Sequence, residues 1–157
     1  NYLALLEGTF LLRMLMPWHD NRGKRLVKSP KLYIRDSGIF HQLLRLKNYQ
    51  DVLLDVRRGA SFEGFALEEV IKALNVRAEE CYFWATHQEA ELDLFVVVEG
   101  KRLGFEFKCT DQPKKTKSTE SARQYLELDH LYIVTPIEET FSLDEKTTVI
   151  ALKDIKI

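Results

Sequence analysis

Two apolar runs joined by a single turn limit the folds open to this chain more than any other feature. Residues 91–98 (ELDLFVVV) and 101–107 (KRLGFEF) are rich in β-branched and aromatic residues, and Glu99-Gly100 stands between them. Two strand-like runs separated by two residues that end in glycine are typical of a tight β-hairpin. The sequence therefore predicts an antiparallel strand pair in the middle of the chain.

The register of this hairpin brings charged residues together. Residues whose numbers sum to 199 face each other, which places Asp93 opposite Glu106 and Glu91 opposite Lys108. Because side chains alternate along a strand, these four project from one face, and the other face carries the predicted core residues Leu92, Leu94, Phe105 and Phe107. Like charges directly opposite are destabilising. A cation is therefore expected beside Asp93 and Glu106, either Lys108 or a divalent metal ion with hard oxygen ligands.

A third carboxylate, Glu63, belongs to a helix predicted from Ser61 to about Leu74. At 100° per residue, Glu63 lies in the middle of the apolar stripe of that helix. A desolvated carboxylate needs a partner, a proton or a metal ion. Alternatively, Ser61 caps the helix and Glu63 is an ordinary acid of its first turn. Asp93, taken alone, is likewise compatible with a charge at the edge of a strand. The convergence of three carboxylates favours a site.

The remaining patterns predict a mixed α/β fold. From residue 59 onward we expect a helix, three strands, a helix and two strands, at about 61–74, 80–86, 91–98, 101–107, 120–128, 131–135 and 147–155. Short turns make the first three strands an antiparallel meander, and the helix at 120–128 is a crossover that makes the next strand parallel. Residues 1–58 form a separate part, with a helix over Leu3–Met16, a loop, a strand at 31–34 and a helix capped by Asp36.

Composition excludes several classes of protein. The 157 residues carry 23 Lys and Arg against 24 Asp and Glu, so no overall field attracts nucleic acid or a membrane. The apolar run at Leu3–Met16 is too short to span a bilayer, and Cys81 and Cys109 lack metal-ligand spacing. We expect a cytoplasmic protein with buried thiols and no membrane partner, and the oligomeric state stays open.

Nucleic-acid binding would therefore depend on local basic patches. Residues 101–117 contain six Lys or Arg against two acids, and the loop PKKTK follows directly after the carboxylates. A second basic stretch covers 22–31. Both stretches are compatible with phosphate contacts and equally with solvated surface loops.

Together these segments resemble a known superfamily. GASFEGFALEEVIKAL, AELDLFVVVEGKRLGFEFK and LYIVT are similar to the core of the PD-(D/E)XK, or restriction-endonuclease-like, superfamily. With VKSPKLYIRDSGIF before them, nearly the whole chain resembles the uncharacterised C-terminal region of predicted prokaryotic ATPases of the AAA type. The resemblance implies a restriction-endonuclease-like core in residues 59–157 and a small helical, winged-helix-like segment in residues 1–58.

The resemblance also implies roles for individual residues. Asp93 and Glu106 would bind Mg²⁺ or Mn²⁺, with the backbone carbonyl of Phe107 as a further ligand. Glu63 would complete or support this shell, and Lys108 would position the attacking water or stabilise the transition state. Hydrolysis of DNA phosphodiesters is the implied reaction, and an ATPase domain in the same full-length chain is the implied partner.

Two departures from the family pattern leave a second hypothesis open. Leu92 stands where a proline precedes the aspartate, and no GxxxxGK[ST] motif is present, so this chain is not expected to hydrolyse ATP. Because a fold can persist without its activity, the alternative is an inactive nuclease-fold module that binds DNA or protein.

Overall fold

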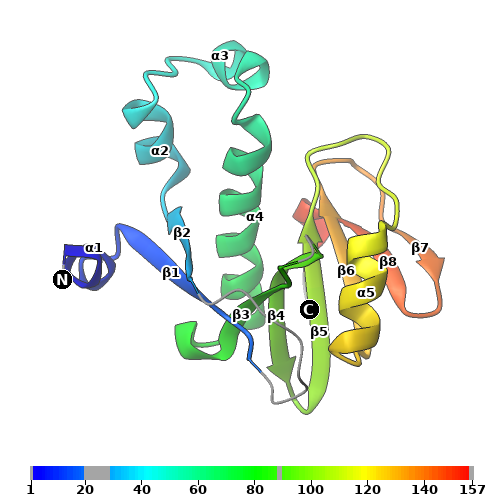
Figure 1. Cartoon of the computed structure of the whole chain (residues 1–157). Helices are drawn as coiled ribbons and strands as arrows, with labels where there is room; N and C mark the ends of the chain where they lie inside the picture. The colour runs from blue at the N-terminus through cyan, green and yellow to red at the C-terminus, as the bar shows by residue number, and fades with distance from the viewer. Residues whose placement is uncertain (1, 20–28, 88–89, 156–157) are drawn as a thin grey trace.

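A computed structural model describes residues 2–19, 29–87 and 90–155 (Figure 1). The helices are α1 (Tyr2–Gly8), α2 (Ser37–Leu43), α3 (Tyr49–Leu54), α4 (Arg58–Leu74) and α5 (Lys117–Tyr125), with short 3-10 turns η1 (Ala78–Glu80) and η2 (Leu152–Asp154). The strands are β1 (Leu12–Pro17), β2 (Lys31–Ile34), β3 (Cys81–Ala85), β4 (Glu91–Val98), β5 (Lys101–Phe107), β6 (His130–Thr135), β7 (Phe141–Asp144) and β8 (Thr147–Ala151).

The described strands form one mixed sheet in the order β2-β1-β3-β4-β5-β6-β8-β7. Strands β3, β4 and β5 are an antiparallel meander, whereas β5, β6 and β8 run parallel. Helix α5 crosses from β5 to β6. The predicted α/β class, the meander and the parallel crossover are therefore confirmed.

The hairpin between β4 and β5 has the predicted turn. Glu99 and Gly100 both have positive φ, 50° and 79°, as the two central residues of a type I′ turn require. The strand pairing runs from Val98 opposite Lys101 to Leu94 opposite Phe105, which is the register that sums to 199. The predicted register is confirmed over this part of the hairpin.

Two apolar clusters hold the sheet between its helices. The first joins buried residues of α4, among them Leu67 and Val70, to β4 and β5. The second joins Ala122 and Leu126 of the α5 segment to Trp84 and to other residues of the central strands. Helices α4 and α5 thus stabilise the strands that carry the predicted carboxylates (Figure 1).

The predicted helix over Leu3–Met16 is wrong in its second half. Helix α1 ends at Gly8, Phe10 has a φ of 60°, and β1 follows from Leu12. Along β1, Arg13, Leu15 and Pro17 are buried and the residues between them are more exposed, which is the period of a strand. Because β1 pairs with both β2 and β3, residues 1–58 contribute two strands to the sheet.

The last predicted strand, 147–155, is too long, because β8 ends at Ala151 and the turn η2 follows. The starts of two helices also differ from the prediction. Helix α4 begins at Arg58 and α5 at Lys117, each three residues before its predicted start. The Asp36 side chain caps α2 by accepting a hydrogen bond from the Ile39 N–H, as predicted. Strands β1 and β7 and helix α3 were not predicted from the sequence.

The structure also bears on the membrane and on the cysteines. Within the described ranges no helix is long and apolar enough to cross a bilayer.

Both cysteines are free thiols. Cys81 is buried, whereas Cys109 is only partly buried and accepts a hydrogen bond from Arg58 Nε at 3.2 Å. The prediction of buried thiols is therefore correct for Cys81 alone.

Candidate metal centre

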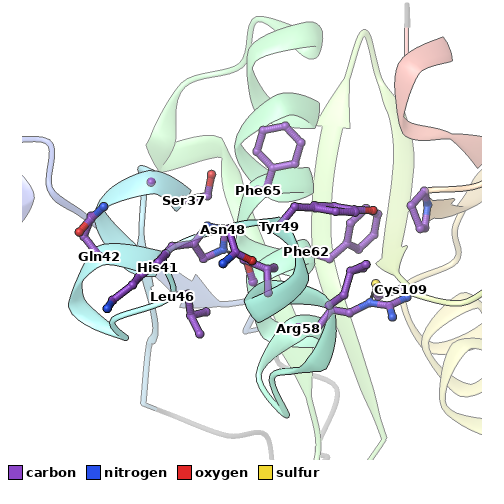
Figure 2. Close-up of a pocket in the computed structure, with 16 residues that line it drawn as sticks. Ser37, His41, Gln42, Leu46, Asn48, Tyr49, Arg58, Phe62, Phe65 and Cys109 are labelled. Atoms are coloured by element: carbon purple, nitrogen blue, oxygen red, sulfur yellow. Dashed lines mark hydrogen bonds between the residues drawn. The ribbon is translucent and has the colours of Figure 1, made fainter.

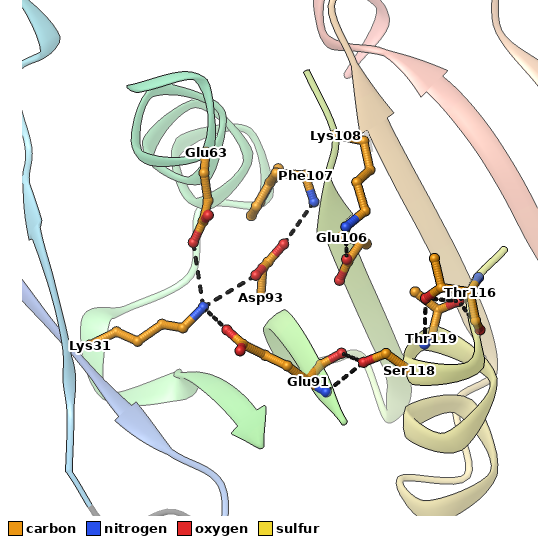
Figure 3. Close-up of polar contacts among 10 residues, drawn as sticks. All are labelled: Lys31, Glu63, Glu91, Asp93, Glu106, Phe107, Lys108, Thr116, Ser118 and Thr119. Atoms are coloured by element: carbon orange, nitrogen blue, oxygen red, sulfur yellow. Dashed lines mark hydrogen bonds and ion pairs between the residues drawn. The ribbon is translucent and has the colours of Figure 1, made fainter. Parts of the chain in front are cut away.

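Four predicted site residues lie around one end of the central hairpin (Figure 3). Glu63 comes from α4, Asp93 from β4 and Glu106 from β5, and Lys108 follows β5 by one residue. Asp93 and Glu106 are only 7% and 6% exposed. Carboxylates from remote positions of the sequence are therefore gathered here, and two of them have little access to water.

Asp93 sits where β4 leaves its regular pairing. The pairing with β3 shifts from Tyr82 opposite Phe95 to Trp84 opposite Leu92, so β4 carries one extra residue, as in a β-bulge. The backbone N–H of Phe107, the last residue of β5, donates a hydrogen bond to Asp93 Oδ2 at 3.0 Å. The bulge thus turns a carboxylate toward a backbone donor of the neighbouring strand.

Because of the same bulge, the prediction that Leu92 shares a core face with three other residues is wrong. Leu92 was expected on the face of Leu94, Phe105 and Phe107. It packs instead in the cluster of α5, while the other three pack in the cluster of α4. One extra residue reverses the alternation of side chains, so the period of two fails on the N-terminal side of Leu94.

Glu106 is the most poorly satisfied carboxylate of the centre. Its Oε1 lies 2.6 Å from Lys108 Nζ, and its Oε2 is buried without a hydrogen-bond partner. Burial raises the pKa of Glu106 to about 7, and the charge of Asp93 adds to this rise while Lys108 opposes it. Burial, followed by the charge of Glu63, likewise raises the pKa of Asp93.

Lys31 is a part of the centre that sequence reasoning missed. From β2, its Nζ lies 3.2 Å from Asp93 Oδ1 and 3.4 Å from Glu63 Oε1, and it also pairs with Glu91. The predicted pair of Glu91 with Lys108 is therefore wrong: Glu91 pairs with Lys31 and Lys108 with Glu106. Strand β5 ends before Lys108, whose N–H donates to Val134, so the residue is no longer opposite β4.

Glu63 is held by neighbours from the N-terminal part. Its Oε1 accepts a hydrogen bond from Tyr33 Oη at 2.6 Å and contacts Lys31. Helix α4 starts five residues before Glu63 and has no acid in its first turn, so a role as a simple first-turn acid is excluded. Its side chain is 26% exposed, which is less than expected of a free surface charge.

The charges of the centre do not balance. Glu63, Glu91, Asp93 and Glu106 bring four negative charges, and Lys31 and Lys108 bring two positive charges, which leaves a formal charge of −2. A deficit of this size beside the buried Asp93 and Glu106 suits one divalent cation with oxygen ligands. Glu106 Oε2 is a buried carboxylate oxygen of this centre that has no hydrogen-bond partner.

The described residues do not form a ready cluster of three metal ligands. In Figure 3 the Lys31 ammonium lies between Glu63 and Asp93. Of the predicted ligands, Asp93 and Glu106 are the two buried carboxylates, and Glu106 Oε2 has no hydrogen-bond partner. Glu63 is engaged by Lys31 and Tyr33 instead.

Helix α5 fixes the strand that carries two of these acids. Ser118 Oγ donates to the carbonyl of Glu91 at 2.7 Å and accepts from its N–H (Figure 3). Thr116 and Thr119 close the first turn of α5 through reciprocal side-chain and backbone hydrogen bonds. The crossover helix thus positions the N-terminal end of β4.

Two members of the predicted basic patch are engaged elsewhere. Lys115 Nζ lies 2.7 Å from Asp144 Oδ2, and the Arg102 guanidinium stacks on Phe95 at 5.0 Å from its ring centre. Lys101, Lys114 and Lys117 are exposed. Of the second stretch, residues 22–28 lie outside the described residues.

A pocket of about 660 Å³ lies apart from the acidic centre. It is lined by residues of α2, α3 and the first turns of α4, and Figure 2 shows Tyr49, Phe62 and Phe65 around it. His41 at its wall is partly buried, and its Nε2 lies 2.6 Å from Ser61 Oγ. None of the four predicted site residues lines this pocket.

Comparison with known proteins identifies a family for this chain. Residues 58–155 match a model described as a domain of unknown function, DUF4143, and residues 1–50 match another domain of unknown function, DUF8612. The uncharacterised proteins Rv2008c of Mycobacterium tuberculosis and Mb2031c of Mycobacterium bovis are each 42% identical over 151 residues. These matches cover 96% of this chain and 33% of each relative, so the chain spans about a third of their length. No solved structure matches the chain significantly. Because the DUF4143 match covers more than half of its residues, the chain belongs to the DUF4143 family.

Proposed function

We propose that this domain is a divalent-metal-dependent nuclease that hydrolyses DNA phosphodiester bonds. The observation that carries the proposal is the pair of buried carboxylates, Asp93 and Glu106. Glu106 Oε2 has no hydrogen-bond partner, and the centre has a formal charge of −2. The order of helix, meander, crossover helix and parallel strand supports a restriction-endonuclease-like core. In that core, acids at these positions serve a metal ion.

The residues would divide the work as follows. Asp93, Glu106 and the carbonyl of Phe107 would hold Mg²⁺ or Mn²⁺, which supplies Lewis-acid polarisation of the phosphate and a more acidic water. Lys108, 39% exposed on its side chain, is placed to reach from Glu106 toward a phosphate at the surface. Its ammonium would offset the negative charge that develops on the phosphate oxygens.

The domain would act within a larger protein. The curated relatives are about three times as long as this chain. The resemblance to the C-terminal region of predicted AAA-type ATPases supports an ATPase domain as the partner in the full-length chain. ATP hydrolysis would take place there, since the present sequence has no phosphate-binding loop.

An inactive module that binds DNA or protein is the second candidate. The observation that favours it is the pairing of Lys31 and Lys108 with the acidic centre, which offsets part of its charge without an ion. Such internal pairing is what a fold retained for binding alone would need.

The test is cleavage of plasmid, single-stranded and branched DNA with Mg²⁺, with Mn²⁺ and with EDTA. We expect ion-dependent cleavage that falls on the order of 10²- to 10³-fold in Asp93→Asn and Lys108→Ala, since each removes a group that acts at the phosphate. Lys72→Ala, an exposed lysine on α4, is the matched control. Cleavage that Asp93→Asn and Lys108→Ala leave unchanged would remove the assignment, and binding of DNA without cleavage would favour the inactive module.

A further inference from the structure

Lys31 occupies the place of a cation among three carboxylates. It reaches Glu63, Glu91 and Asp93 from β2, at an edge of the sheet, although these acids lie at least 32 positions further along the chain. It comes from the segment that matches DUF8612, and the acids come from the segment that matches DUF4143. The N-terminal part therefore supplies a charge to a centre built by the other part.

The ammonium of Lys31 is fixed from several directions. Its Nζ lies 5.5 Å from the centre of the aromatic ring of Phe83, a residue of strand β3. Tyr33, two residues further along β2, holds the Glu63 carboxylate through a 2.6 Å hydrogen bond. These contacts fix the Lys31 ammonium among the three acids.

This arrangement divides the acidic centre into two cation positions. One lies between Glu63, Glu91 and Asp93 and holds the Lys31 ammonium. The other lies beside Asp93 and Glu106, where Oε2 has no partner. A divalent ion in the first position would have to displace the ammonium, and two like charges cannot share it.

We propose that Lys31 is the second cation of this centre, a positioning residue that keeps Glu63 and Glu91 from binding metal and limits the site to one divalent ion. This inference rests on the proposed function, because it names how many ions the same site takes. Removal of the Lys31 charge would free Glu63, Glu91 and one oxygen of Asp93, and would open a second, weaker site.

The test is a titration of the protein with Mn²⁺, in which electron paramagnetic resonance measures the free ion and gives the number bound. We expect one Mn²⁺ per chain in the wild type and two in Lys31→Gln and in Lys31→Met, which keeps the apolar stem of the side chain. Lys31→Arg retains the charge and is expected to bind one. Lys72→Gln, an exposed lysine, is the matched control and is also expected to bind one.

The outcomes separate this inference from the proposed function. If the uncharged variants bind one Mn²⁺ with the affinity of the wild type, the role of Lys31 is overturned and the metal site remains. If the wild type binds none and the uncharged variants bind one, Lys31 does occupy a cation position but the site at Asp93 and Glu106 is wrong. If no form binds Mn²⁺, both are wrong.

Discussion

A Glu106→Gln variant is expected to be more stable than the wild-type protein in EDTA at pH 8, by about 1–3 kcal/mol in free energy of unfolding. Glu106 is buried, lies beside Asp93 and has one oxygen without a partner. Glutamine has nearly the same shape and no charge, so it removes a repulsion at the cost of one ion pair with Lys108. Chemical denaturation followed by circular dichroism measures the difference.

The pH dependence gives this prediction a definite sign. The pKa of Glu106 rises from 4.5 to about 7 on folding, so the folded state binds the proton more tightly than the unfolded state. The resulting stabilisation is complete below about pH 4.5 and is lost as the pH rises through 7. The advantage of the Gln variant should therefore shrink between pH 8 and pH 5.5.

Addition of Mg²⁺ should reverse the ranking at pH 8. An ion that binds only the folded wild-type protein stabilises it, and the variant loses a ligand of that ion. Glu139→Gln, at an exposed position, is the control and should show neither effect. A Glu106→Gln protein that is less stable in EDTA at pH 8 would show that Glu106 is a structural ion-pair partner rather than a strained ligand.

An Arg13→Met variant is expected to lose about 3–5 kcal/mol in free energy of unfolding, because it leaves a carboxylate without its main partner. Arg13 on β1 is 7% exposed and bonds to both oxygens of Glu68 on α4, with Nη2 2.9 Å from Oε2. Arg35 also reaches Glu68, at 3.1 Å, but is itself a third exposed. The pair joins the N-terminal strands to the long helix.

A second substitution separates the ion pair from simple packing. Arg13→Met combined with Glu68→Leu removes both charges and should recover most of the lost stability. Lys153→Met, in an exposed pair with Glu138, is the control and should not change the denaturation midpoint measurably. If Arg13→Met lost less than about 1 kcal/mol, water would have to reach Glu68, and the burial of the pair would be wrong.

The parts of the fold that follow from local chemistry could be predicted. Glu99 and Gly100 suit a two-residue turn, so these two residues were sufficient to predict the register of β4 and β5. Strand β1 could not be found in this way, because the run at Leu12–Pro17 continues the apolar pattern of the preceding helix. Its partner strand β3 lies more than sixty residues away in the sequence. Tertiary pairing decided the structure of β1.

The candidate site was predictable to a similar extent. Spacing on the hairpin and on the helix selected Glu63, Asp93 and Glu106, and the structure gathers them. Lys31 was not predictable, because its contact depends on the placement of β2 beside the acids of α4 and β4. The bulge that turns Asp93 toward the Phe107 N–H leaves no local pattern in the sequence.

The most direct test of the metal centre is a crystal structure of the protein soaked in Mn²⁺, with data collected at a wavelength where manganese scatters anomalously. The predicted result is one anomalous peak within coordination distance of Asp93 and Glu106, with Lys31 Nζ still between Glu63 and Asp93. No peak at these carboxylates in a crystal that holds Mn²⁺ elsewhere would contradict the proposal that they bind a divalent ion.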